Sequence, residues 1–253
     1  MYDNNYLANR LRAASVGHDD SLFAELLDGR KICYGEMFAI AEKNALALIS
    51  AGLKPGDCVA TQVEKSIESI QLYIGTVLAG GVFLPLNTAY TPTEMAYFLG
   101  DAKPKIFVCD PVKKLSLQPL SDDAGVTILL TLAADGSGSL IDALTERHDN
   151  FKAVPRSKHD LASFLYTSGT TGRSKGAMLS HENLASNAET LSQYWHFSKD
   201  DVLIHALPIF HIHGLFVAIN ITLCAGSSLL FDPRFDSELI LQQMEKATVL
   251  MGV

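Results

Sequence analysis

Short apolar segments alternate with longer amphipathic ones along this chain, and this alternation constrains its fold more than any other feature. Residues 58–63 and 106–109 are apolar runs of strand length, whereas residues 36–50 carry their apolar side chains mostly on one side of a helix. Such alternation is typical of an α/β protein in which mixed or parallel sheets are flanked by helices. With 253 residues, the chain can bury a substantial core.

Turn and capping residues predict further elements. Asp28-Gly29 predicts a hairpin between residues 21–27 and 31–34, because Asp-Gly tolerates the positive φ of a tight turn. Ser66 and Ser180 are expected to cap helices, since their hydroxyls can accept from free backbone N–H groups. The remaining predicted strands are 82–84, 126–130, 161–166, 176–180, 202–206, 228–231 and 248–253, and the remaining predicted helices are 66–78, 91–101, 181–195 and 237–246.

The polar segment 148–159 is the best candidate for a boundary between two α/β subdomains, residues 1–150 and residues 151–253. The chain ends inside the apolar run 247–253, without a turn or a polar tail. Natural termini are usually exposed and polar, so we expect the second subdomain to be incomplete and the chain to be truncated.

Composition excludes several classes of partner. The formal net charge is −8 and no cluster of Lys and Arg is present, which argues against nucleic acid and against an anionic membrane surface. The N-terminus lacks the apolar core of a signal peptide, and the cleanest apolar stretch, 215–225, is too short to cross a bilayer. Four scattered cysteines fit a reducing compartment, so we expect a soluble, cytoplasmic protein whose oligomeric state remains open.

One loop carries most of the chemical information. Its sequence is Tyr166-Thr167-Ser168-Gly169-Thr170-Thr171-Gly172-Arg173-Ser174-Lys175-Gly176. The glycines let backbone N–H groups approach an anion, the hydroxyls add donors, and Lys175 adds a point charge. The loop follows a predicted strand, so it would project from a sheet edge, where ligands bind in α/β proteins. Its spacing is not that of a Walker A loop, and the simplest alternative is a surface turn rich in small residues.

These residues resemble the phosphate-binding signature of the adenylate-forming enzymes, a superfamily of acyl-CoA synthetases, firefly luciferase and peptide-synthetase adenylation domains. Residues 207–214, Leu-Pro-Ile-Phe-His-Ile-His-Gly, resemble the segment that lines the acid pocket in the same superfamily. The resemblance covers essentially the whole chain, which corresponds to roughly the first half of such an enzyme. Residues 62–68, 79–90 and 201–208 look most like malonyl-CoA synthetases.

The resemblance implies an acid:CoA ligase that uses Mg·ATP to adenylate malonate and then transfers the acyl group to coenzyme A, giving malonyl-CoA, AMP and pyrophosphate. It assigns catalytic roles to Thr167, Lys175 and His211, a magnesium contact to Thr167, and acid binding to His211 and His213. The residues expected to bind ATP are Thr167, Ser168, Gly169, Thr170, Thr171, Gly172 and Lys175. For histidines the simpler interpretation is a buried core residue, which we keep for His205.

Other parts of the superfamily's machinery have no counterpart in this chain: the later acidic residue for magnesium, the aspartate for the ribose, and the C-terminal domain with its lysine. We therefore expect the 253-residue chain to be inactive by itself. The alternatives are a synthetase for another short or aromatic acid, a nucleotide hydrolase or kinase with an unusual phosphate loop, and a non-catalytic module that binds nucleotide or acyl groups.

Overall fold

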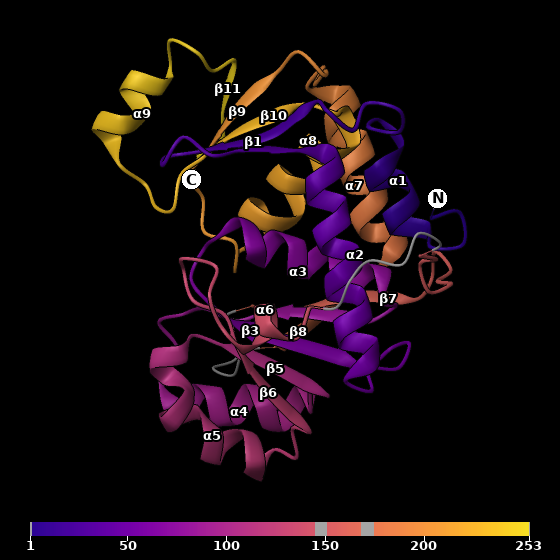
Figure 1. Ribbon diagram of the computed structural model, residues 1–253, viewed down its shortest axis with the longest axis vertical. Helices are drawn as coiled ribbons and strands as arrows, with labels where there is room; N and C mark the ends of the chain where they lie inside the picture. Colours follow the sequence, from indigo (N-terminus) through magenta and orange to yellow (C-terminus); the bar gives the residue numbers. More distant parts are fainter. Residues whose placement is uncertain (1, 145–150, 168–174, 253) are drawn as a thin grey trace.

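The computed structural model describes residues 2–144, 151–167 and 175–252. Its strands form two sheets separated by a layer of helices (Figure 1). The first sheet has the order β11-β9-β10-β1-β2 and comprises β1 (Leu22–Leu26), β2 (Lys31–Cys33), β9 (Val202–His205), β10 (Ser228–Phe231) and β11 (Val249–Leu250). All neighbouring pairs in it are parallel except the β1–β2 hairpin.

The second sheet has the order β6-β5-β3-β4-β7-β8. Its strands are β3 (Cys58–Gln62), β4 (Val82–Pro85), β5 (Ile106–Cys109), β6 (Ile128–Thr131), β7 (Leu161–Thr167) and β8 (Lys175–Ser180). The neighbours are again parallel except for one hairpin, β7–β8. In each sheet the parallel strands therefore end at one shared edge, which is where ligands bind in α/β proteins.

Helices fill the space between the sheets and cover their outer faces. Those between the sheets are α1 (Tyr6–Ala13), α2 (Tyr34–Ser50), α3 (Ile67–Leu78), α7 (His181–Tyr194), the π-helical segment η2 (His213–Ile219) and α8 (Asn220–Ala225) (Figure 1). The others are α4 (Pro92–Ala102), the single turn η1 (Pro111–Lys113), α5 (Lys114–Asp123), α6 (Ser139–Asp142) and α9 (Ser237–Gln243). Buried contacts join α4 and α5 to the six-stranded sheet and α9 to the five-stranded sheet.

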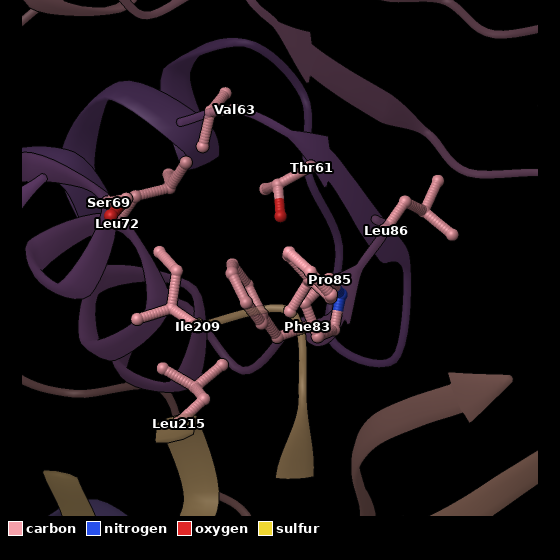
Figure 2. Close-up of a pocket in the computed structure, with 10 residues that line it drawn as sticks. Thr61, Val63, Ser69, Leu72, Phe83, Pro85, Leu86, Ile209 and Leu215 are labelled. Atoms are coloured by element: carbon pink, nitrogen blue, oxygen red, sulfur yellow. The ribbon is translucent and has the colours of Figure 1, made fainter. Parts of the chain in front are cut away.

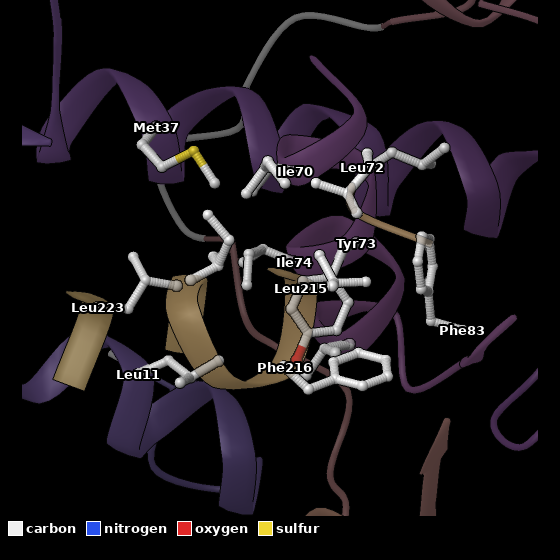
Figure 3. Packing of buried hydrophobic residues seen from close by; sticks show 14 of the residues in the cluster. Leu11, Met37, Ile70, Leu72, Tyr73, Ile74, Phe83, Leu215, Phe216 and Leu223 are labelled. Atoms are coloured by element: carbon white, nitrogen blue, oxygen red, sulfur yellow. The ribbon is translucent and has the colours of Figure 1, made fainter. Parts of the chain in front are cut away.

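The main hydrophobic core lies around the central helices (Figure 3). Ile70 and Ile74 of α3 meet Met37 of α2 and Phe216 of η2 there, all buried. The Tyr73 hydroxyl donates to Asn220 Oδ1 at 3.2 Å, so this polar group does not remain unpaired in the core. The π-helical turn leading into α8 is therefore fixed against α3 on the side that faces the sheet edges.

The structure confirms the predicted fold class, a mixed α/β arrangement with parallel and antiparallel pairs flanked by helices. The hairpin at 28–29 and the caps at Ser66 and Ser180 are also confirmed. The proposed division into residues 1–150 and 151–253 stays a prediction, and residues 148–150 of its boundary lie outside the described residues. Each sheet takes strands from both sides of residue 150. Within the described ranges no helix is long and apolar enough to span a bilayer.

Candidate functional site

The phosphate-loop segment begins where β7 ends. Thr167 is the last residue of β7, Lys175 is the first residue of β8, and the two are paired across the antiparallel hairpin. Because β7 runs parallel to β4, β7 ends and β8 begins at the edge where β3 and β4 also end. Lys175 is exposed at this edge, where its ammonium group can reach an anion.

Five of the expected ATP-binding residues lie outside the described residues: Ser168, Gly169, Thr170, Thr171 and Gly172. The backbone of Thr167 is described as part of β7, and its side chain is not. The phosphate-binding and metal-binding roles of these residues therefore stay predictions.

The base of the hairpin is anchored to α4 by Tyr166. Its hydroxyl donates to Asp101 Oδ2 at 2.6 Å, and its ring lies 4.5 Å from that of Phe98 between centroids. Burial, together with the hydrogen bond to Asp101, raises the pKa of the Tyr166 hydroxyl, so it remains a donor at neutral pH. Earlier in the same strand, Ser163 Oγ donates to the Phe83 carbonyl of β4 at 2.7 Å. The side chains of Ser163 and Tyr166 thus hold β7 against β4 and α4.

Residues 206–214, which run from the end of β9 into the first two residues of η2, form a closed turn that we call turn 206–214. His205 Nε2 donates to the Gly214 carbonyl at 2.7 Å, which joins the two ends of the turn. Since a carbonyl only accepts, this contact places the ring proton on Nε2. Burial lowers the pKa of His205 to about 3, so the ring is neutral, as the core interpretation of this residue predicts.

Both histidines expected at the acid site lie on turn 206–214. His211 is exposed, with its ring centroid 4.8 Å from that of Phe210, and His213 is half-buried at the first position of η2. The turn therefore brings the two side chains near the sheet edge without burying either in the core. Their roles in acid binding stay predictions.

A pocket, which we call the central pocket, lies between turn 206–214 and the ends of β3 and β4 (Figure 2). It is lined by Thr61, Val63, Ser69, Leu72, Phe83, Pro85, Leu86, Ile209, Phe210 and Leu215. Among these side chains only Thr61 and Ser69 are polar, and the Ser69 hydroxyl already donates to the Ser66 carbonyl. Neither His211 nor His213 is part of this lining. The central pocket therefore has a mostly apolar lining, and none of its lining residues is a cation.

Lys65 lies in segment 64–68, whose mixture of charges is typical of a solvated loop, yet Lys65 is buried. Lys65 is only 9% exposed, and its Nζ donates to the His205 carbonyl at 2.7 Å. The same ammonium group lies 4.6 Å from the centroid of the Phe231 ring, on which the His205 ring stacks at 5.4 Å. A lysine between two glutamates carries no sequence signal of burial, because only the approach of the second sheet covers it.

Asp232 is a buried acid whose charge interacts with that of Lys65. It is fully buried, its backbone N–H donates to the His205 carbonyl at 3.1 Å, and its Oδ1 accepts from Gln243 Nε2 at 2.8 Å. Burial raises the pKa of Asp232, and the charge of Lys65 opposes that rise. Burial also lowers the pKa of Lys65 to about 7, against the attraction of Asp232. Each group therefore makes the charged form of the other less costly.

The lowered pKa of Lys65 predicts a pH-dependent stability. Between about pH 7 and pH 10 the folded chain holds Lys65 neutral while the unfolded chain keeps it protonated, so the unfolded state binds more protons and stability rises with pH. Relative to Lys65→Met, the wild-type chain should gain up to about 1.4 kcal/mol of unfolding free energy per pH unit in this range. Urea unfolding across that range measures the difference, with the exposed Lys54→Met as the control that keeps the wild-type slope. Equal slopes for Lys65→Met and wild type would refute the shift.

Turn 206–214 also depends on the absence of a side chain at Gly214. A Cβ there would lie 2.2 Å from the Pro208 carbonyl oxygen, a backbone atom that cannot move aside cheaply. Gly214→Ala should therefore lower the free energy of unfolding by about 1–3 kcal/mol, the usual cost of forcing a methyl group into filled space. Gly100→Ala is the matched control, because nothing lies within 4 Å of its Cβ position in α4. A Gly214→Ala chain as stable as the control would contradict the close approach.

The described residues contain no group of three or more His, Cys, Asp or Glu side chains placed to hold a metal ion. The magnesium contact that the resemblance assigns to Thr167 stays a prediction.

These features describe an α/β protein whose candidate ligand-binding residues lie at or just beyond the carboxyl ends of parallel strands. The AMP-binding enzyme family matches residues 10–253, and the chain belongs to that family. The crystal structure of apo MatB from Rhodopseudomonas palustris is 53% identical, superposes with a TM-score of 0.94, and covers 99% of this chain and 49% of its own. ATP-bound MatB from the same organism matches with the same identity and TM-score over 98% of this chain and 49% of its own.

Curated relatives are more distant. Oxalate–CoA ligase of Arabidopsis thaliana is 30% identical over 78% of this chain and 39% of its own length. Malonate–CoA ligase of the same plant is 29% identical over 73% of this chain and 30% of its own length. The chain thus spans less than half the length of these relatives and about half that of MatB.

Proposed function

We propose that this chain is the ATP-phosphate-binding and acid-binding part of an acid:CoA ligase that acts on malonate. The observation that carries the proposal is the match to MatB over 99% of this chain at 53% identity, together with the ATP-bound form of MatB. The names of the malonate–CoA and oxalate–CoA ligases among the relatives support a small dicarboxylic acid as substrate.

In this proposal the phosphate loop binds ATP. Residues 168–174 connect Thr167, at the carboxyl end of β7, with exposed Lys175, the first residue of β8, and their sequence is rich in hydroxyl groups and glycine. Thr167, Ser168, Gly169, Thr170, Thr171 and Gly172 would hold the phosphates, and Lys175 would offset their charge as the acid oxygen attacks the α-phosphate. In that attack a bond forms from carboxylate oxygen to phosphorus as the bond from phosphorus to the pyrophosphate oxygen breaks.

The acid would bind beside turn 206–214. His211, exposed at the turn, would lie near the reacting carboxylate, and His213 would face the rest of the acid. The apolar central pocket offers no cation, so a second carboxylate would have to be met at the histidine side. Coenzyme A would accept the acyl group, its thiol displacing AMP from the acyl adenylate.

Thr167 would contact the magnesium ion, which would offset phosphate charge when bound. The cysteines at positions 33, 58, 109 and 224 are all free in the structure, which supports a reducing compartment, and we propose the cytoplasm.

Calorimetry of Mg·ATP tests the nucleotide part of the proposal. The comparison uses the chain alone and a joined protein, in which this chain replaces the matched part of R. palustris MatB. Because the chain spans only 49% of MatB, we expect weak or undetectable binding by the chain alone and clear binding by the joined protein. Tight, magnesium-dependent binding by the chain alone would instead favour a self-sufficient nucleotide-binding module. A folded joined protein that does not bind ATP would contradict the proposal.

A further inference from the structure

The central pocket is built from both halves of the fold. Thr61 and Val63, at and just beyond the end of β3, form one side, and Ile209 and Phe210 of turn 206–214 form another (Figure 2). These walls belong to chain segments almost 150 residues apart, one following a strand of the six-stranded sheet and the other a strand of the five-stranded sheet. The spacing between the walls therefore depends on what holds the two strand ends together.

Lys65 makes that connection. It lies two residues after Val63, and its ammonium group donates to the carbonyl of His205, the last residue of β9. The His205 ring in turn donates to the Gly214 carbonyl, and this second hydrogen bond closes the turn that carries Ile209 and Phe210. Lys65 thus joins the end of β3 to the base of turn 206–214 through a single 2.7 Å hydrogen bond.

The surroundings of Lys65 fit a fixed position. The Phe231 ring lies on one side of the ammonium group, and Asp232 adds its N–H to the same His205 carbonyl. The other charged groups beside this segment are Arg30, Asp28 and Glu68, which are paired with one another on the surface. Burying the charge of a lysine costs free energy, so the contacts that Lys65 makes in this position have to offset that cost.

We propose that Lys65 is a positioning residue that sets the spacing between the end of β3 and turn 206–214, and thereby the placement of the turn on which the proposed acid-binding histidines lie. Its meaning for the reaction rests on the proposed function, whereas its effect on the pocket does not. Replacing Lys65 should change the environment of Val63 and Ile209 together, and should leave distant parts of the core as they are.

Methyl NMR spectra of the chain labelled at Val, Leu and Ile test the positioning directly. In Lys65→Met, the methyl resonances of Val63, Ile209 and Leu215 should shift, while those of Ile106 and Ile128, at the amino ends of β5 and β6, should not. Lys65→Arg keeps a cationic donor and should restore most of the wild-type positions. The exposed Lys54→Met is the matched control and should reproduce the wild-type spectrum.

Two results would overturn the proposal: a Lys65→Met spectrum with unchanged pocket methyls, or one in which all methyls shift alike. If Lys65→Met does not fold, Lys65→Arg decides, since a folded Lys65→Arg chain whose pocket methyls lie far from their wild-type positions would also overturn it.

In the joined protein, Lys65→Met should raise KM for malonate at least about tenfold while changing kcat less than about threefold, the pattern of lost binding rather than lost chemistry. An equal fall in kcat and kcat/KM would contradict positioning of the acid. The proposed function fails separately, if the joined protein with its native Lys65 shows no acid-dependent activity at all.

Discussion

The joined protein should use malonate at least about a hundredfold better than acetate or butyrate, measured as kcat/KM for acid-dependent pyrophosphate release. The reason is the second carboxylate. A site built to hold it leaves donors or cations unpaired when an acid lacking that group binds, and unpaired buried charge is costly. The apolar central pocket does not hold such a charge, so we expect the histidines of turn 206–214 to contribute to holding it.

His213 is the residue of this chain on which that preference should depend most. It is half-buried at the start of η2, next to the closed end of turn 206–214. His213→Phe should lower kcat/KM for malonate more than for acetate, whereas the exposed His18→Phe should change neither. Preference of the joined protein for a medium-chain or aromatic acid would contradict the malonate assignment and leave membership of the AMP-binding family untouched.

Replacing Lys175 by alanine should slow adenylation in the joined protein at least about tenfold, the effect of losing one charged contact in the transition state. Lys175 is exposed at the start of β8, so its removal leaves no cavity and should not alter stability. Lys199→Ala, an exposed lysine in the loop before β9, is the control. Measurement is by malonate-dependent ATP–pyrophosphate exchange, and an unchanged rate would remove Lys175 from the mechanism.

The fold could be predicted from local signals because those signals agree with the tertiary structure. The runs at 58–62 and 106–109 are buried on both faces, as their continuous apolar sequence indicates, and Ser66 caps α3 as expected. Helix α1 was missed: its burial is limited to Leu7, Ala8 and Leu11, and its short polar sequence gives a weak periodic signal.

Several side chains could not be placed from the sequence because tertiary contacts decide their burial. Lys65 reads as a surface residue and is buried by the end of β9. Tyr194 and Trp195 read as packing on a helix face, yet they are 78% and 45% exposed, since α7 ends at the surface there. The motif at 207–214 indicated a pocket, but which of its side chains enter that pocket depends on the closed geometry around Gly214.

The central claim is that this chain supplies the ATP and acid sites of a malonate:CoA ligase. ATP–pyrophosphate exchange in the joined protein, with and without malonate, tests it most directly, because exchange requires reversible formation of the acyl adenylate and does not involve coenzyme A. We predict exchange that depends on malonate in the joined protein and none in the chain alone. A joined protein that unfolds cooperatively but shows no exchange with malonate or any other carboxylic acid would contradict the account.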